Sequence, residues 1–180
     1  MTIGRGRSLG DQEIKGILKV LNNTEFEMHK RGKYTEARWW GNKIVKDAFG
    51  EYLHWYLTTM TYPYGVPIKG CWSHRYEANG HMMGMHQDKK ADSLNPKHEE
   101  NEYWTTTCLI EKSEDLSGGE IVLAGDSYED FKEFTSRSRL KVINLTEVGH
   151  TAVWNGNTIH GVSEITNGYR WVFVVYKVIE

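Results

Sequence analysis

The segment "TIHGVSEITNGYRWVFVVYKV", residues 158–178, decides the fold class of this chain. Two runs rich in β-branched and aromatic residues, 158–165 and 169–178, flank the turn sequence Thr166–Gly168. Such runs favour strands, and an Asn-Gly pair between them favours a hairpin turn. We therefore expect β-structure here, with the last two strands joined as a hairpin.

Short strand-like runs extend back from this segment to about residue 71. They are "CWSHRY", "HMMGMHQ", "YWTTTCLI", "GEIVLAG", "LKVINL" and "TAVWN". Short strands without long helices between them are typical of an antiparallel sandwich or jelly roll. The stretches 88–102 and 125–139 interrupt the pattern and are interpreted as insertions, the second with a short helix. The predicted fold is mainly β, a jelly roll of the double-stranded β-helix type.

The first third of the chain has a helical period instead. Ile14, Ile17, Leu18 and Leu21 fall on one face of a helix of about three turns. A second apolar stripe begins at Ala37 and Trp40 and continues to about Met60, where "TYPYGVP" stops it. We expect one domain over residues 1–180, with a helical part at 1–60 packed on one outer face of a jelly-roll core at about 71–178.

Composition restricts the class of protein. The 180 residues are 39% hydrophobic and 26% charged, with a formal net charge of −2, which fits a globular protein and gives no electrostatic footprint for nucleic acid or an anionic membrane. Two cysteines, Cys71 and Cys108, are too few for a disulfide scaffold. No secretory signal or membrane-spanning apolar run is present, so a soluble cytoplasmic protein is expected.

A candidate metal site begins at "GMHQD", residues 84–88. Residues two apart on a strand share a face, so His86 and Asp88 would present an imidazole and a carboxylate side by side. Alone, the pair could equally be a polar strand end. His160, on a late strand of a jelly roll, could supply a third ligand, and two histidines with one carboxylate suit a non-haem iron with open positions. Arg170, ten residues further on, would be costly to bury unless it held an anion such as a carboxylate.

With these residues the sequence resembles the iron(II)- and 2-oxoglutarate-dependent dioxygenases, in their prolyl 4-hydroxylase-like branch. The resemblance covers about residues 71–178 and includes "RYEANGHMMGMHQD", "LSGGEIVL" and "VGHTAVWNGNTIHGV". It implies Fe(II) on His86, Asp88 and His160, with Arg170 on the far carboxylate of 2-oxoglutarate. It also implies Tyr76 as a co-substrate contact, O2 as the second co-substrate and ascorbate as a support of activity.

The sequence departs from the family pattern after the strand threonines. Members often have Tyr-Leu-Asn there, and that Tyr helps to bind 2-oxoglutarate, whereas this chain has Ile110, Glu111 and Lys112. The contact is therefore missing or supplied otherwise, by Thr107 or Tyr103.

The resemblance also bears on the substrate. It favours hydroxylation of a prolyl residue in a peptide or protein, with the loop at 88–102 as a lid. Another protein residue, a free amino acid or another small molecule, and a jelly-roll protein that binds metal without turnover, are the alternatives. Nucleic-acid demethylases of the superfamily usually carry a second arginine where this chain has Tyr176, so no nucleic-acid partner is expected. His81 and His150 are not expected to be ligands.

Overall fold

The structure is a computed structural model that describes residues 4–28, 34–88, 101–125 and 140–179. Its two helices are α1 (Asp11–Leu21) and α2 (Asn42–Met60). Within the described residues, neither helix combines the length and apolar character needed to cross a membrane. The lid expected at 88–102 falls almost entirely outside the described residues, as does the short helix expected at 125–139.

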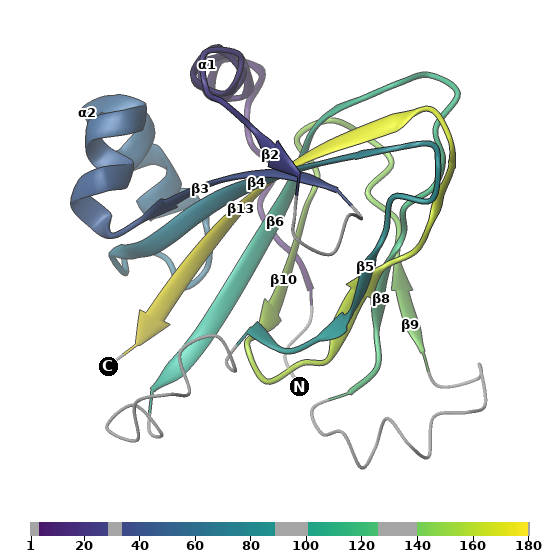
Figure 1. Ribbon diagram of the computed structural model, residues 1–180. Coiled ribbons are helices and arrows are strands. Elements are labelled where there is room, and N and C mark those ends of the chain that lie inside the picture. The colour runs from purple at the N-terminus through teal and green to yellow at the C-terminus, as the bar shows by residue number, and fades with distance from the viewer. Residues whose placement is uncertain (1–3, 29–33, 89–100, 126–139, 180) are drawn as a thin grey trace.

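Two antiparallel sheets dominate the molecule (Figure 1). The larger has seven strands in the order β1-β10-β6-β13-β4-β3-β2. Their bounds are Gly4–Arg5 (β1), Thr151–Asn155 (β10), Glu102–Lys112 (β6), Tyr169–Ile179 (β13), Ile68–Glu77 (β4), Thr35–Trp40 (β3) and Glu27–Met28 (β2). The smaller has four, β5 (Met83–His86), β11 (His160–Val162), β8 (Ile121–Leu123) and β9 (Lys141–Ile143). A third sheet has two short strands, β7 (Ser117–Gly118) and β12 (Ile165–Asn167).

Strand alternation gives the large sheet two apolar faces. In β13, Trp171, Phe173 and Val175 belong to the core shared with the helices, whereas Val172 and Val174 belong to a second core on the other face. The helices contribute Ile14, Ile17, Leu21, Val45, Phe49, Leu53 and Leu57 to the first core. Both helices thus cover one outer face of the large sheet and the small sheet lies beyond the other, which confirms the predicted fold (Figure 1).

The start of the second helix was predicted wrongly. Ala37 and Trp40 lie in β3, where they pair with Ser73 and Gly70 of β4. The spacing of three between Ala37 and Trp40 matches a helical stripe by coincidence. In the strand, the inward face is formed by Ala37 and the partly buried Trp39, which are two residues apart. The helix begins only after Gly41, whose φ of 107° breaks the strand.

The predicted C-terminal hairpin was also wrong. β12 pairs with β7, and β13 is inserted between β4 and β6 of the large sheet, so the two neighbours in sequence belong to different sheets. Gly168, with φ of 68°, turns the chain from one to the other, and a Cβ there would lie 2.0 Å from Ser113 Oγ. The turn residue was recognised correctly, but its partner strand was not.

One buried lysine joins the large sheet to the end of α2. Lys177 of β13 donates from Nζ to the carbonyl oxygens of Thr58, Thr61 and Pro63, at 2.7, 2.8 and 3.0 Å. An ammonium group has three N–H donors, so all three are satisfied.

Candidate active site

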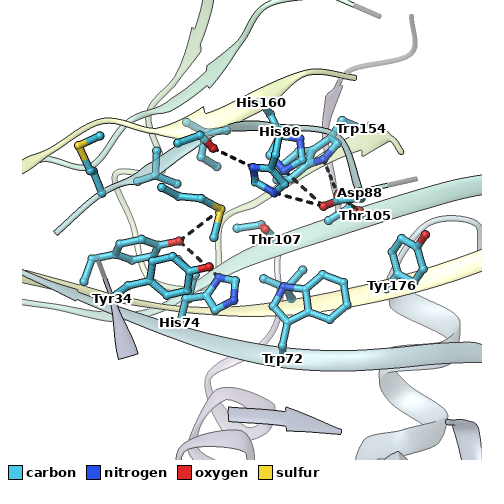
Figure 2. Close-up of a pocket in the computed structure, with 18 of the residues that line it drawn as sticks. Tyr34, Trp72, His74, His86, Asp88, Thr105, Thr107, Trp154, His160 and Tyr176 are labelled. Atoms are coloured by element: carbon cyan, nitrogen blue, oxygen red, sulfur yellow. Dashed lines mark hydrogen bonds and ion pairs between the residues drawn. The ribbon is translucent and has the colours of Figure 1, made fainter. Parts of the chain in front are cut away.

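Two neighbouring strands of the small sheet bring the expected histidines together. His86 ends β5 and His160 begins β11, and the two residues pair directly, with ring centroids 4.2 Å apart. Asp88 follows two residues after His86. One ligand atom from each of the three side chains lies within 4.8 Å of the other two, and Figure 2 shows the three converging on one point.

Hydrogen bonds of the two Nδ1 atoms leave the Nε2 atom of each imidazole facing Asp88. His86 Nδ1 lies 2.9 Å from the carbonyl oxygen of Gly84, and His160 Nδ1 lies 2.9 Å from that of Thr158. A carbonyl only accepts, so each Nδ1 carries the proton and each neutral Nε2 keeps a lone pair. These two Nε2 atoms lie 3.5 and 3.6 Å from Oδ1 of Asp88.

The second oxygen of Asp88 is anchored to the large sheet. Its Oδ2 accepts hydrogen bonds from Thr105 Oγ1 at 2.5 Å and from Trp154 Nε1 at 3.2 Å. Burial raises the pKa of Asp88, but His160, His86 and Thr105 outweigh it and hold that pKa well below its usual range. Burial likewise lowers the pKa of His160. The site therefore combines an anionic carboxylate with a buried His160 whose neutral form is favoured.

This donor set fits a divalent metal ion. Two imidazole nitrogens and one carboxylate oxygen converge here, all within 4.8 Å of one another. Such an arrangement suits Fe(II) with open positions for further ligands.

Arg170 of β13 is a buried cation on the wall opposite the small sheet. It is 3% exposed, and within the described part of the chain its Nε and Nη2 have no hydrogen-bond partner. Burial lowers its pKa, and Tyr76 and Glu120 oppose that effect. Gly119, with φ of 76°, makes room for it, since a Cβ there would lie 2.8 Å from Arg170 Cδ. Two unpaired charged donors in a cavity wall are suited to an anion.

A cavity of about 680 Å³ connects the metal-ligand cluster with Arg170. Tyr76 and Thr107, which the sequence suggested as co-substrate contacts, line it, and so do the metal-ligand candidates. Tyr103 is not among its lining residues and instead stacks on Tyr176, with ring centroids 5.9 Å apart.

The departure from the family pattern has a structural basis in β6. A register shift opposite Trp171 and Val172 leaves Ile110 in the helix-side core, and Glu111 accepts a hydrogen bond from Tyr169 at 2.6 Å. Neither residue lines the cavity. Of the two residues suggested in place of the missing tyrosine, Thr107 lines the cavity and Tyr103 does not.

The remaining histidines considered in the sequence lie outside the cluster. His81 Nδ1 accepts from the backbone N–H of Glu77 at 3.0 Å, and His150 pairs with Glu147 at 3.1 Å. His81 precedes β5 rather than lying in it.

Sequence reasoning missed the groups that orient Asp88. Thr105 and Trp154 are cross-strand partners in β6 and β10, so they form a neighbouring donor pair. The alternation of Thr105 and Thr107 in "TTT" could have indicated a polar inward face. Trp154 gave no signal beyond its place in a strand.

Comparisons with known proteins agree with this architecture. No family model matches the chain, and no curated protein matches it in sequence. Among solved structures it is similar to an oxidoreductase of the 2OG-Fe(II) oxygenase family from Burkholderia pseudomallei (TM-score 0.62, 15% identity, 94% of this chain and 79% of that chain). It is also similar to a prolyl hydroxylase from Trichoplax adhaerens in complex with a hypoxia inducible factor peptide fragment (0.54, 16%, 98% and 82%).

A third similar structure is HygX from Streptomyces hygroscopicus with nickel, 2-oxoglutarate and hygromycin B bound (TM-score 0.61, 12% identity, 97% of this chain and 81% of that chain). The chain therefore has the jelly-roll fold of the 2OG-Fe(II) oxygenases. At these identities the likeness establishes the fold alone.

Proposed function

We propose that the protein is an Fe(II)- and 2-oxoglutarate-dependent dioxygenase that hydroxylates an unactivated C–H bond. One observation carries the proposal. Two imidazole nitrogens and one carboxylate oxygen converge in the same cavity as a buried arginine, two of whose donors have no partner among the described residues. A metal site and an anion site that share a cavity fit a ligand that chelates the metal at one end and carries a carboxylate at the other.

Each residue has a distinct part in this proposal. His86, Asp88 and His160 hold the metal from one side, and Thr105 keeps Asp88 Oδ1 turned toward it. Arg170 pairs with the far carboxylate of 2-oxoglutarate, where burial strengthens the attraction. When bound, the iron supplies the O2-dependent decarboxylation of 2-oxoglutarate to succinate and CO2 and the transfer of one oxygen atom to substrate. The protein contributes position and exclusion of water, and no protein acid or base is required.

For the substrate we propose a prolyl residue of a peptide or protein. Trp40, Trp72 and Tyr176 form a stacked aromatic wall in the cavity, with ring centroids 5.5 to 6.3 Å apart. Trp40 packs close to Gly70, where an added Cβ would lie 2.7 Å from its Cε3, and it is 45% exposed. Such a wall gives the pyrrolidine ring an apolar face to pack against. The peptide fragment bound to the Trichoplax prolyl hydroxylase supports the same class of substrate.

Succinate release tests the activity. Purified protein with Fe(II), ascorbate and 2-oxoglutarate is expected to release succinate, and Asp88→Ala is expected to release none because the metal loses the carboxylate of Asp88. Glu147→Gln, which alters a carboxylate outside the cavity, is the matched control. Metal-loaded protein that releases no succinate under any condition would contradict the enzyme proposal. Incubation with a peptide library, read as a mass gain of one oxygen atom on proline, tests the substrate.

A further inference from the structure

A buried polar chain, Glu36–His74–Tyr76, runs along the large sheet beside the cavity. Glu36 of β3 pairs with His74 of β4, and Tyr76 lies two residues further along β4 on the same face. His74 Nε2 is 3.6 Å from Glu36 Oε2, and its Nδ1 is 3.3 Å from the Tyr76 hydroxyl. We propose that Glu36 and His74 are positioning residues that fix Tyr76 beside Arg170 and so set the affinity for 2-oxoglutarate.

Burial restricts the motion of the two side chains in this polar series that line the cavity. His74 is 5% exposed and Tyr76 is 1% exposed. The ring of Tyr34 packs against both, with centroids 4.7 Å from His74 and 5.3 Å from Tyr76. Figure 2 shows Tyr34 and His74 on the wall opposite the metal-ligand cluster. Packed rings of this kind hold one rotamer, so the hydrogen bonds between them keep one direction.

The Glu36 carboxylate determines the direction of the hydrogen bond between His74 and Tyr76. Arg38 donates to Glu36 Oε2 from Nε and Nη2, at 3.0 and 2.8 Å. Burial raises the pKa of Glu36, but His74 and Arg38 outweigh it and lower that pKa, so Glu36 is ionised. An ionised carboxylate beside Nε2 places the His74 proton on that nitrogen, which leaves Nδ1 as an acceptor. Tyr76 then donates its hydroxyl proton to His74 Nδ1 at 3.3 Å, in competition with the longer contact of the same hydroxyl to Met83 Sδ at 3.9 Å.

The consequence reaches Arg170 through the Tyr76 ring. The guanidinium carbon lies 5.8 Å from the centre of that ring, within the range of a cation–π contact. A ring held by its hydroxyl cannot tilt away, so it keeps the guanidinium facing the cavity. Because the hydroxyl proton points at His74, Tyr76 offers the cavity only lone pairs. The hydrogen-bond donors for the carboxylate of 2-oxoglutarate then come from Arg170. Tyr76 holds Arg170 in position and does not itself donate to that carboxylate.

Calorimetry on Fe(II)-loaded protein without O2 tests this inference, which rests on the proposed function for its ligand. His74→Asn, Glu36→Gln and Tyr76→Phe are each expected to weaken 2-oxoglutarate binding by about threefold to tenfold, the effect of one hydrogen bond. The double variant His74→Asn/Tyr76→Phe is expected to bind no more weakly than Tyr76→Phe, because both changes cut the same link. Metal affinity is expected to stay unchanged in all of them.

A matched control and a second readout separate the outcomes. Glu147→Gln removes the carboxylate beside His150, outside the cavity, and is expected to leave 2-oxoglutarate affinity unchanged. Imidazole nitrogen NMR is expected to show the His74 proton on Nε2. A proton on Nδ1, or additive losses in the double variant, would overturn the inference. Failure of the wild-type protein to bind 2-oxoglutarate would refute the proposed function as well, whereas normal binding by the His74 and Glu36 variants would refute this inference alone.

Discussion

Replacing Arg170 with methionine is expected to stabilise the ligand-free protein while removing its affinity for 2-oxoglutarate. The guanidinium is 3% exposed, and its Nε and Nη2 lack partners in the part of the chain that the structure describes. An unsatisfied buried donor costs about 1–3 kcal/mol, so an apolar side chain of similar length is expected to recover about 2 kcal/mol. For a chain of this size that raises Tm by about 4–8 °C.

The same change removes one partner of a buried charge pair in the complex. Such a loss costs about 2–5 kcal/mol, which weakens 2-oxoglutarate binding by about 30-fold to several thousandfold. Calorimetry measures the affinity, thermal unfolding of the metal-free protein measures Tm, and metal analysis checks that iron still binds. Arg170→Lys is the control, because it keeps a buried charge and should not raise Tm. A lower Tm for Arg170→Met, or loss of metal, would show that the guanidinium is structural and would refute the reasoning.

Three further changes test the rest of the site and the fold. Trp154→Phe removes one donor to Asp88 Oδ2, so metal affinity is expected to fall about tenfold with the fold intact, as a metal titration would show; unchanged affinity would contradict the anchoring role. Burial lowers the pKa of both His74 and His160, so below about pH 6.5 the unfolded chain takes up protons that the folded one refuses. The urea midpoint of the metal-free protein is therefore expected to fall between pH 7.5 and 5.5, and a flat profile would refute the assignment of neutral histidines. Lys177→Met leaves three carbonyl oxygens at the end of α2 without their shared donor, so we expect a loss of about 3 kcal/mol and a Tm lower by about 6–12 °C; a Tm within a degree of wild type would contradict it.

The parts of the fold that depend on local pattern were predictable. The long apolar runs of β6 and β13 are central strands with both faces covered, so their composition alone marks them. Gly168 was recognised as a turn because a positive φ favours glycine. Which strand pairs with which is a non-local choice, and the mistaken hairpin arose there.

The candidate site divides in the same way. The types and order of His86, Asp88, His160 and Arg170 indicated a metal site and an anion site before any geometry was known. An arginine that follows a His-x-Asp pair and a distal histidine has few other roles when it is buried. The chain of Glu36 and His74 was not predictable, since it depends on β3 being a strand. A helix at Ala37 and Trp40 would have placed Glu36 far from the cavity wall.

The two sheets each carry one half of the candidate site. His86 and His160 lie on the small sheet, and Arg170 lies on the large one. A ligand that binds both the metal and Arg170 would therefore link the two sheets. Ligand binding would then resist separation of the sheets as well as filling the cavity. Slower amide hydrogen exchange in β8 and β11 is the expected sign of that link.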